Sequence, residues 1–126
     1  MITPGEYTLL LTDELQRAIA ANRGRDPLEV ALDRNTPHAR LVATQVKSLA
    51  RAEAKLPSYA SAQCILPPLA FEQASSEACA AHKRIAGGAV LDLTCGLGAD
   101  AFFLARRFRR VVTLERDQTL ARIAAE

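Results

Sequence analysis

The spacing of apolar residues is helical near the start of the chain. Leu15 and Ile19 are four residues apart, which places them on one helical face and predicts a helix over about residues 12–21. Asp26-Pro27 combines a favourable N-cap residue with proline at the first helical position. A second, short helix is therefore expected to begin there and to end near residues 33–35.

The next stretch predicts a long helix, an extended connection and another helix. An apolar stripe at helical spacing covers residues 36–56, and Pro57 is expected to stop that helix. Residues 57–68 are rich in Ser, Ala and Pro, which is typical of an extended connection. A further helix is expected over residues 69–86, with Gly87-Gly88 terminating it. Most of the chain up to the glycine pair is therefore expected to be helical.

The periodicity changes after the glycine pair. Short apolar runs of β-forming residues at 89–93 and 110–114 flank a helix expected at about 99–108, and another helix is expected after the second run. A strand, a helix and a strand within this length predict a parallel β-α-β unit. The sequence therefore predicts an α/β protein, with a helical segment over residues 1–68 and the start of a sheet-containing domain over residues 69–126.

Composition and charge exclude several classes of protein. The chain is 49% hydrophobic and 24% charged, which is normal for a globular domain, and its net charge of +2 identifies no nucleic-acid partner by itself. No apolar run approaches the length of a membrane span, and residues 1–6 resemble no export signal, so a cytoplasmic protein is expected. Cys64, Cys79 and Cys95 have no spacing typical of metal ligands, so no metal is expected.

The most specific motif joins the first apolar run to the helix that follows it. Asp92-Leu93-Thr94-Cys95-Gly96-Leu97-Gly98 places an acidic residue at a strand end and a Gly-x-Gly turn before a helix. Glycines let the backbone approach a ligand closely, and free N–H groups at a helix start favour negative charge. The second apolar run leads to Glu115, 17 residues after Gly98, where a carboxylate can accept hydrogen bonds from ribose hydroxyls. Together these features predict a nucleotide-cofactor site.

Two classes of cofactor fit a glycine turn of this kind. Gly96-Leu97-Gly98-Ala99-Asp100-Ala101 matches the G-x-G-x-x-A form of a dinucleotide-binding turn, as used by nicotinamide- and flavin-dependent oxidoreductases. However, Asp92 lies four residues before Gly96, and its carboxylate would repel a pyrophosphate. The same carboxylate would attract the ammonium and sulfonium groups of S-adenosyl-L-methionine, so the sequence favours that cofactor.

The chain resembles the class I S-adenosylmethionine-dependent methyltransferases. Asp92-x-Thr94-x-Gly96-x-Gly98 is similar to the first motif of that family, D/E-x-G-x-G-x-G, with Thr94 in place of the first glycine. Together with Phe71-Glu72-Gln73-Ala74-Ser75-Ser76-Glu77, the motif resembles bacterial methyltransferases that carry a THUMP-like domain. The resemblance implies a Rossmann-like methyltransferase sheet, of which this chain holds the first β-α-β-α and is expected to be a truncated part.

The resemblance also implies roles for individual residues. Asp92 is expected to bind the amino-acid end of the cofactor directly or through water, and Glu115 to bind the ribose hydroxyls. Gln73 and Ser75 are expected to close over the methionine part, although a serine near a helix start is often a cap. Asp100 fits either a cofactor contact or a favourable charge in the first helical turn. The full set of expected cofactor-binding residues is Asp92, Thr94, Gly96, Gly98, Asp100, Glu115, Gln73 and Ser75.

The implied reaction is transfer of a methyl group from S-adenosyl-L-methionine, with RNA as the substrate class by resemblance alone. The catalytic residues are expected beyond Glu126, so this part alone is expected to be inactive. The cluster of Arg106, Arg107, Arg109 and Arg110 fits a solvated face or an RNA contact. Two alternatives stay open, an NAD(P)- or flavin-dependent oxidoreductase and a non-catalytic helical interaction module. The sequence indicates no oligomeric state.

Overall fold

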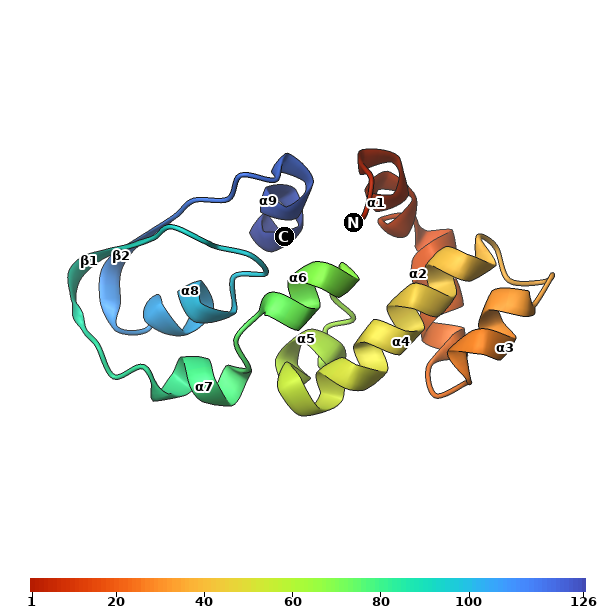
Figure 1. The fold of residues 1–126 in the computed structure, drawn as a ribbon, viewed down its shortest axis with the longest axis horizontal. Helices are drawn as coiled ribbons and strands as arrows, with labels where there is room; N and C mark the ends of the chain where they lie inside the picture. Colours follow the sequence, from red (N-terminus) through yellow and green to blue (C-terminus); the bar gives the residue numbers. More distant parts are fainter. The chain divides into compact units, whose positions relative to one another are not determined.

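The computed structural model describes residues 1–126, which form two compact units, Met1–Pro68 and Leu69–Glu126 (Figure 1). The first unit is helical, and the second combines helices with a two-stranded parallel sheet. The prediction of a mixed α/β chain is therefore confirmed. No helix in the structure has the length and apolar character needed to cross a membrane.

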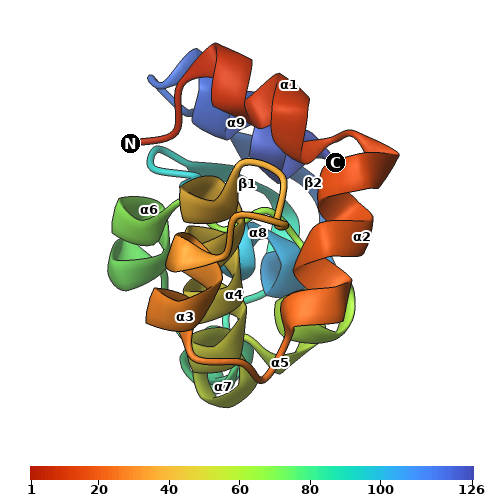
Figure 2. The same ribbon diagram turned by 90° about the vertical axis from the view of Figure 1, so that its right-hand side faces the viewer.

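The first unit is built around its longest helix, α4. This helix packs against α2, α3 and α5, and Figure 2 shows it between α2 and α3. Its buried face carries Val42, Val46 and Leu49, each at most 2% exposed, which is the stripe that the helical spacing predicted. The bounds of the five helices are α1 (Pro4–Leu10), α2 (Asp13–Asn22), α3 (Pro27–Leu32), α4 (Ala39–Lys55) and α5 (Pro57–Ser61).

Helix α1 was not predicted from the sequence. It begins with a capping box in which the Glu6 N–H donates to Thr3 Oγ1 (3.2 Å) and the Thr3 N–H donates to Glu6 Oε2 (2.8 Å). Proline at its first position suits a helix start. The short polar sequence Thr3-Pro4-Gly5-Glu6 thus holds a recognisable signal for a helix start. The helix that follows has only seven residues, so it shows little apolar periodicity from which it could be predicted.

The extended connection predicted over residues 57–68 is wrong in its first half. Pro57 ends α4 but also occupies the first position of α5, where proline is well tolerated. Only the part after Ser61 is irregular, and the buried Gln45 side chain holds it. The Gln45 carboxamide accepts from the Leu66 N–H (2.9 Å) and donates to the Leu66 carbonyl (3.3 Å), so a buried stretch of loop has both backbone groups paired.

The single helix predicted over residues 69–86 is also wrong, because it is two short helices. Helix α6 (Pro68–Gln73) ends at residues 74–76, and Ser76 caps α7 (Glu77–His82) by accepting a hydrogen bond from the Cys79 N–H (3.1 Å). A serine that pairs with the backbone ahead of it competes with a continuous helix. The break matters because it brings Ser75 to the site described below.

The parallel pairing predicted for the two apolar runs is confirmed. Strand β1 (Gly87–Asp92) pairs with β2 (Phe108–Thr113) in a register that sets Leu91 beside Val112 and Asp92 beside Thr113. Each strand begins two residues earlier than predicted. Hydrogen bonds continue past the strands, from the Leu114 N–H to the Asp92 carbonyl (2.8 Å). The carboxyl ends of both strands therefore lie at the same edge of the sheet.

Two helices flank these strands. Helix α8 (Ala99–Leu104) connects β1 to β2 and packs against β2 and α7, and α9 (Gln118–Ala125) follows β2 with Asp117 as its N-cap (Figure 1). Helix α8 is shorter than the predicted 99–108. The Arg106 and Arg107 N–H groups donate to carbonyls three residues back, at Phe103 and Leu104, so the helix closes in a tight turn before β2.

Candidate functional site

The glycine turn after β1 has a backbone shape that needs glycine. Gly96 (φ 55°) and Gly98 (φ 77°) both have left-handed backbone angles, and the Gly98 N–H closes the turn on the Cys95 carbonyl (2.8 Å). A Cβ built on Gly96 would meet no atom within 4 Å, so this part of the turn faces open space. The motif therefore presents bare backbone to a cavity rather than filling a packed corner.

Asp92 shapes the start of this turn. Its Oδ1 accepts a hydrogen bond from the Thr94 N–H (3.0 Å), an arrangement in which an aspartate bonds the backbone two residues on. Thr94 has no left-handed backbone angle, which explains why a residue with a Cβ is accommodated where the methyltransferase motif has its first glycine. Asp92 is half-buried and Thr94 is exposed.

Glu115 links the end of β2 to the glycine turn. Its Oε2 accepts from the Gly96 N–H (3.0 Å), and its Oε1 accepts from the Asp117 N–H (2.9 Å). One carboxylate thus fixes both the turn after β1 and the start of α9. Each carboxylate oxygen can accept more than one hydrogen bond, so Glu115 keeps acceptor capacity for a ligand.

Asp100 is held by two partners in a way that the sequence did not reveal. Its Oδ2 accepts from Ser75 Oγ (3.0 Å), and its Oδ1, which is shielded from solvent, pairs with Lys83 Nζ (2.7 Å). Arg107 adds to this connection by donating to the carbonyls of Ala81 (2.9 Å) and Lys83. Lys83 and Arg107 were not predicted as site residues. Lys83 follows α7 whereas Asp100 lies in α8, so the spacing of these residues in the sequence does not reveal that they are in contact.

A cavity of about 570 Å³ lies at this edge of the sheet. Its wall includes Leu93, Leu97 and Leu120 as apolar surface, and Arg116 as a cation that sequence reasoning missed. Asp92 and Gly98 do not line the cavity, and both act on the shape of the turn instead. The predicted residues that do line it are Gln73, Ser75, Thr94, Gly96, Asp100 and Glu115.

The chemistry of this cavity is that of a site for a polar organic ligand with an apolar part. Glu115 supplies a carboxylate whose charge faces no cation among its hydrogen-bond partners, whereas the charge of Asp100 is matched by Lys83. Hydroxyl or ammonium groups of a ligand can donate to Glu115, and a flat ring can lie on the leucine side chains. No group of three or more His, Cys, Asp or Glu side chains is placed to hold a metal ion.

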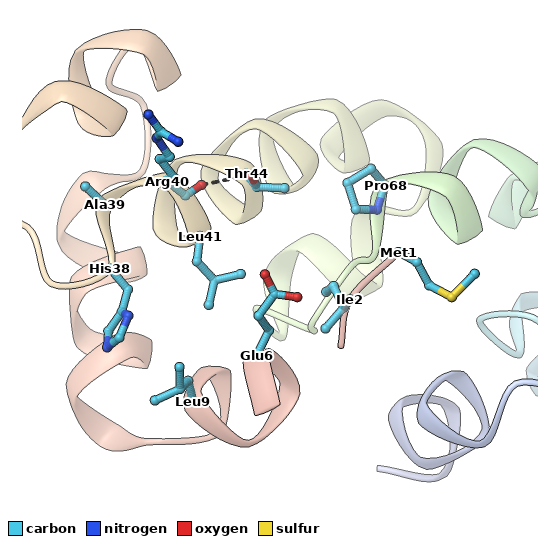
Figure 3. Close-up of a pocket in the computed structure, with 10 residues that line it drawn as sticks. All are labelled: Met1, Ile2, Glu6, Leu9, His38, Ala39, Arg40, Leu41, Thr44 and Pro68. Atoms are coloured by element: carbon cyan, nitrogen blue, oxygen red, sulfur yellow. Dashed lines mark hydrogen bonds between the residues drawn. The ribbon is translucent and has the colours of Figure 1, made fainter. Parts of the chain in front are cut away.

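A second cavity of about 570 Å³ lies in the first unit, between α1 and the start of α4 (Figure 3). Its polar groups do not converge on a common point. Glu6 Oε2 is occupied by the Thr3 N–H and hydroxyl, and Figure 3 shows the Arg40 guanidinium directed away from Glu6. None of the predicted site residues lines this cavity. The better candidate for a functional site is therefore the first cavity, at the carboxyl edge of the sheet, which we call the glycine-turn cavity.

Comparison with known proteins gives one informative similarity. No protein-family model and no curated protein sequence match the chain. The chain is similar to a crystal structure from Porphyromonas gingivalis W83 that is described as a "putative methyltransferase", with 27% identity and a TM-score of 0.74. The match covers 99% of this chain and 32% of that chain. The chain therefore has the fold of about one third of that methyltransferase structure.

Proposed function

We propose that the glycine-turn cavity binds S-adenosyl-L-methionine and that the chain is part of a class I methyltransferase with a Rossmann-like sheet. The observation that carries the proposal is the hydrogen bond from the Gly96 N–H to Glu115 Oε2, which joins the glycine turn of one strand to the acidic end of the next. Similarity to a structure described as a "putative methyltransferase" supports the same proposal.

The residues present fit the cofactor in their chemistry. Glu115 would accept hydrogen bonds from the ribose hydroxyls, and the bare backbone at Gly96 leaves room for the cofactor to approach. Gln73 and Ser75 line the same cavity and would lie against the methionine part. The bound cofactor would supply an activated methyl group on its sulfonium, and the protein would contribute alignment of that group with the substrate nucleophile.

Asp92 and Asp100 have less direct parts in this proposal. Asp92 would act through the turn that it holds at Thr94 or through water, because it does not line the cavity. Asp100 would position Ser75, since its two oxygens already pair with Ser75 and Lys83. Gly98 would also act through the shape of the turn, because its N–H donates a hydrogen bond to the Cys95 carbonyl.

The activity of the whole protein is a broader proposal. The chain spans 32% of the similar structure, so the activity, substrate and catalytic residues of the whole protein are proposals. By the resemblance in sequence we propose RNA as the substrate class and a THUMP-like domain elsewhere in the protein. The cytoplasmic location stays a prediction of the sequence.

A dinucleotide-dependent oxidoreductase is the second candidate, and one observation favours it. The Asp92 carboxylate, which the sequence predicts would repel a pyrophosphate, accepts a hydrogen bond from the Thr94 N–H and does not line the cavity. Repulsion is therefore weaker than the sequence suggested. Glu115 serves a ribose in either class, so ligand binding has to separate the two.

Calorimetry on the full-length protein with S-adenosylhomocysteine and with NAD makes that separation. S-adenosylhomocysteine is expected to bind more tightly than NAD. Glu115→Ala should weaken its affinity by about 10- to 100-fold, because hydrogen bonds to a charged group contribute about 1.5–3 kcal/mol. Glu14→Ala is the matched control, since Glu14 is exposed and lies in the helical unit. Tighter binding of NAD, or equal effects of the two variants, would overturn the proposal.

A further inference from the structure

The amino ends of β1 and β2 carry an unusual concentration of positive charge. Residues 78–91 and 101–114 contain six lysines and arginines and no aspartate or glutamate. The net charge of the whole chain is +2, so the rest of the chain carries a formal charge of −4. We call this surface the basic edge, and its cations are Lys83, Arg84, Arg106, Arg107, Arg109 and Arg110.

The fold brings these two sequence segments together. Parallel pairing sets Gly87 beside Phe108 and Ala89 beside Arg110, so the residues just before β1 and the first residues of β2 share one edge. Arg107 strengthens this arrangement by donating hydrogen bonds to the carbonyls of Ala81 and Lys83. Asp92 and Glu115 lie at or just after the carboxyl ends of the same strands, where Arg116 is also found, so that edge has charges of both signs while the basic edge carries cations alone.

Half of the basic edge has protein partners and half has none. Lys83 pairs with Asp100, and Arg107 is bound to backbone carbonyls. Arg106 lies over the rings of Phe102 (4.9 Å) and Phe103 (5.1 Å). The other three cations are exposed and form no hydrogen bond or ion pair within the chain: Arg84, Arg109 and Arg110.

We propose that the basic edge binds the phosphate backbone of a single-stranded nucleic acid. Unpaired arginines supply the phosphate contacts that dominate nucleic-acid affinity. The surface is also open, because a cavity of about 530 Å³ lies beside Arg84 and Arg107, and a Cβ on Gly88 would meet nothing within 4 Å. This cavity leaves space for a phosphate beside Arg84 and Arg107.

The aromatic residue beside the edge favours a nucleic acid over other polyanions. Phe102 is 50% exposed, and its ring is in contact with the Arg106 guanidinium. Exposed aromatic rings and arginine planes stack on unpaired bases, whereas lipid headgroups and acidic peptides offer no comparable flat ring. A surface that combines free arginines with an exposed ring therefore fits single-stranded RNA or DNA.

This inference rests on the proposed function only in giving the bound strand a role as substrate. The three free arginines lie before or near the amino ends of the strands, whereas the glycine-turn cavity lies at the carboxyl ends, so a nucleic acid bound to these arginines would be held by its backbone while another part of it reaches the cavity. Lys83 connects the two regions through its ion pair with Asp100. Binding at the edge and binding in the cavity can be measured separately, so the two proposals can fail separately.

The test is fluorescence anisotropy of the full-length protein with a labelled single-stranded 20-nucleotide oligouridylate, across a series of salt concentrations. The triple variant Arg84→Gln, Arg109→Gln and Arg110→Gln should lose at least about tenfold in affinity near physiological salt, and its salt slope should fall by about 2. The matched control, Arg34→Gln, Arg40→Gln and Lys47→Gln, removes the same charge from exposed positions of the first unit and should change both quantities little.

Further measurements decide the class of partner. Phe102→Ala should weaken binding of the oligouridylate and leave binding of heparin unchanged, because heparin has no base to stack.

A triple variant with lysine in place of Arg84, Arg109 and Arg110 should keep most of the affinity for the oligouridylate, which separates loss of charge from loss of fold. Equal losses in the basic-edge and control triples, or tighter binding to phosphatidylserine vesicles than to RNA, would overturn the inference. Loss of RNA binding with S-adenosylhomocysteine binding intact in the triple variant supports it.

Discussion

The two units of the chain are stabilised in different ways. In the first unit the apolar side chains are enclosed, and Leu10, Val42 and Leu49 are at most 1% exposed. In the second unit some apolar side chains of the sheet are exposed to solvent. The paired residues Leu91 of β1 and Val112 of β2 are 55% and 37% exposed. Side-chain hydrogen bonds hold loops in both units, but in the second unit those of Glu115 and Asp100 lie at the glycine turn and its cavity.

This difference leads us to expect a supporting role for the first unit and a binding role for the second. A closed helical core resists change because each side chain contacts several others. A glycine turn held by carboxylates can present backbone groups to a ligand, since its shape depends on hydrogen bonds rather than on enclosed side chains. We therefore expect substitutions in the first unit to lower stability and substitutions around the turn to act mainly on binding.

The largest expected effect is from truncating the helical core. Leu49→Ala should lower the free energy of unfolding by about 2–5 kcal/mol, because it removes buried methyl groups and leaves a cavity. Leu91→Ala removes the same atoms from an exposed strand position and should cost less than about 1 kcal/mol. Urea unfolding followed by circular dichroism measures both. Similar losses in the two variants would show that the contrast between the units is false.

The next effect concerns the loop that closes the helical unit. Gln45→Ala should cost about 1–3 kcal/mol, since it leaves the buried N–H and carbonyl of Leu66 without partners. Gln16→Ala is a suitable comparison because Gln16, although it bonds Leu10 and Gln63, is only half-buried. Thermal unfolding of the two variants should rank Gln45→Ala as the more damaging. A neutral result at Gln45 would mean that water replaces the carboxamide.

A smaller effect is expected from the ion pair beside the glycine-turn cavity. Lys83→Met should cost about 1 kcal/mol or less, because both side chains are partly exposed. A double-mutant cycle with Asp100→Asn should give a coupling energy of the same size, and S-adenosylhomocysteine affinity should fall in Asp100→Asn because the hydrogen bond from Ser75 to a charged acceptor becomes a weaker one to a neutral amide. Asp13→Asn, at an exposed position of the first unit, is the control. Additive losses in the cycle would contradict a positioning role for the pair.

The sequence predicted the parts of this fold that depend on local pattern. Strand pairing and the α4 stripe follow from apolar spacing, and six of the eight predicted site residues line one cavity. The sequence failed where long-range contacts decide. The Gln45–Leu66 and Lys83–Asp100 contacts join residues that are far apart in the sequence, and no regular spacing of residues predicts them. The break at Ser75-Ser76 is a different case, because there an N-cap hydrogen bond competes with a continuous helix.

The smallest effect is a pH dependence at the start of the first unit. Hydrogen bonds from the Thr3 N–H and hydroxyl lower the pKa of Glu6 below its usual value of 4.5. A carboxylate with a lowered pKa stabilises the folded state above its unfolded pKa, and that contribution is lost as the pH falls through its folded pKa. Helix α1 should therefore loosen below about pH 4.5, and hydrogen exchange at the amides of residues 5–10 measures it.

Thr3→Ala removes the hydroxyl partner of Glu6 but keeps the backbone N–H, so it should reduce that acid-dependent step without abolishing it. We expect a cost of about 0.5–1 kcal/mol at neutral pH, which is typical of losing an N-cap, and a smaller cost once the pH has fallen below the lowered pKa of Glu6, where its carboxyl is protonated in the parent. Thr8→Ala lies in the same helix and leaves the capping box intact, so it should retain the step. If Thr8→Ala and Thr3→Ala titrate alike, the capping box does not anchor α1, and the stability of that helix comes from Tyr7 and Leu10 packing alone.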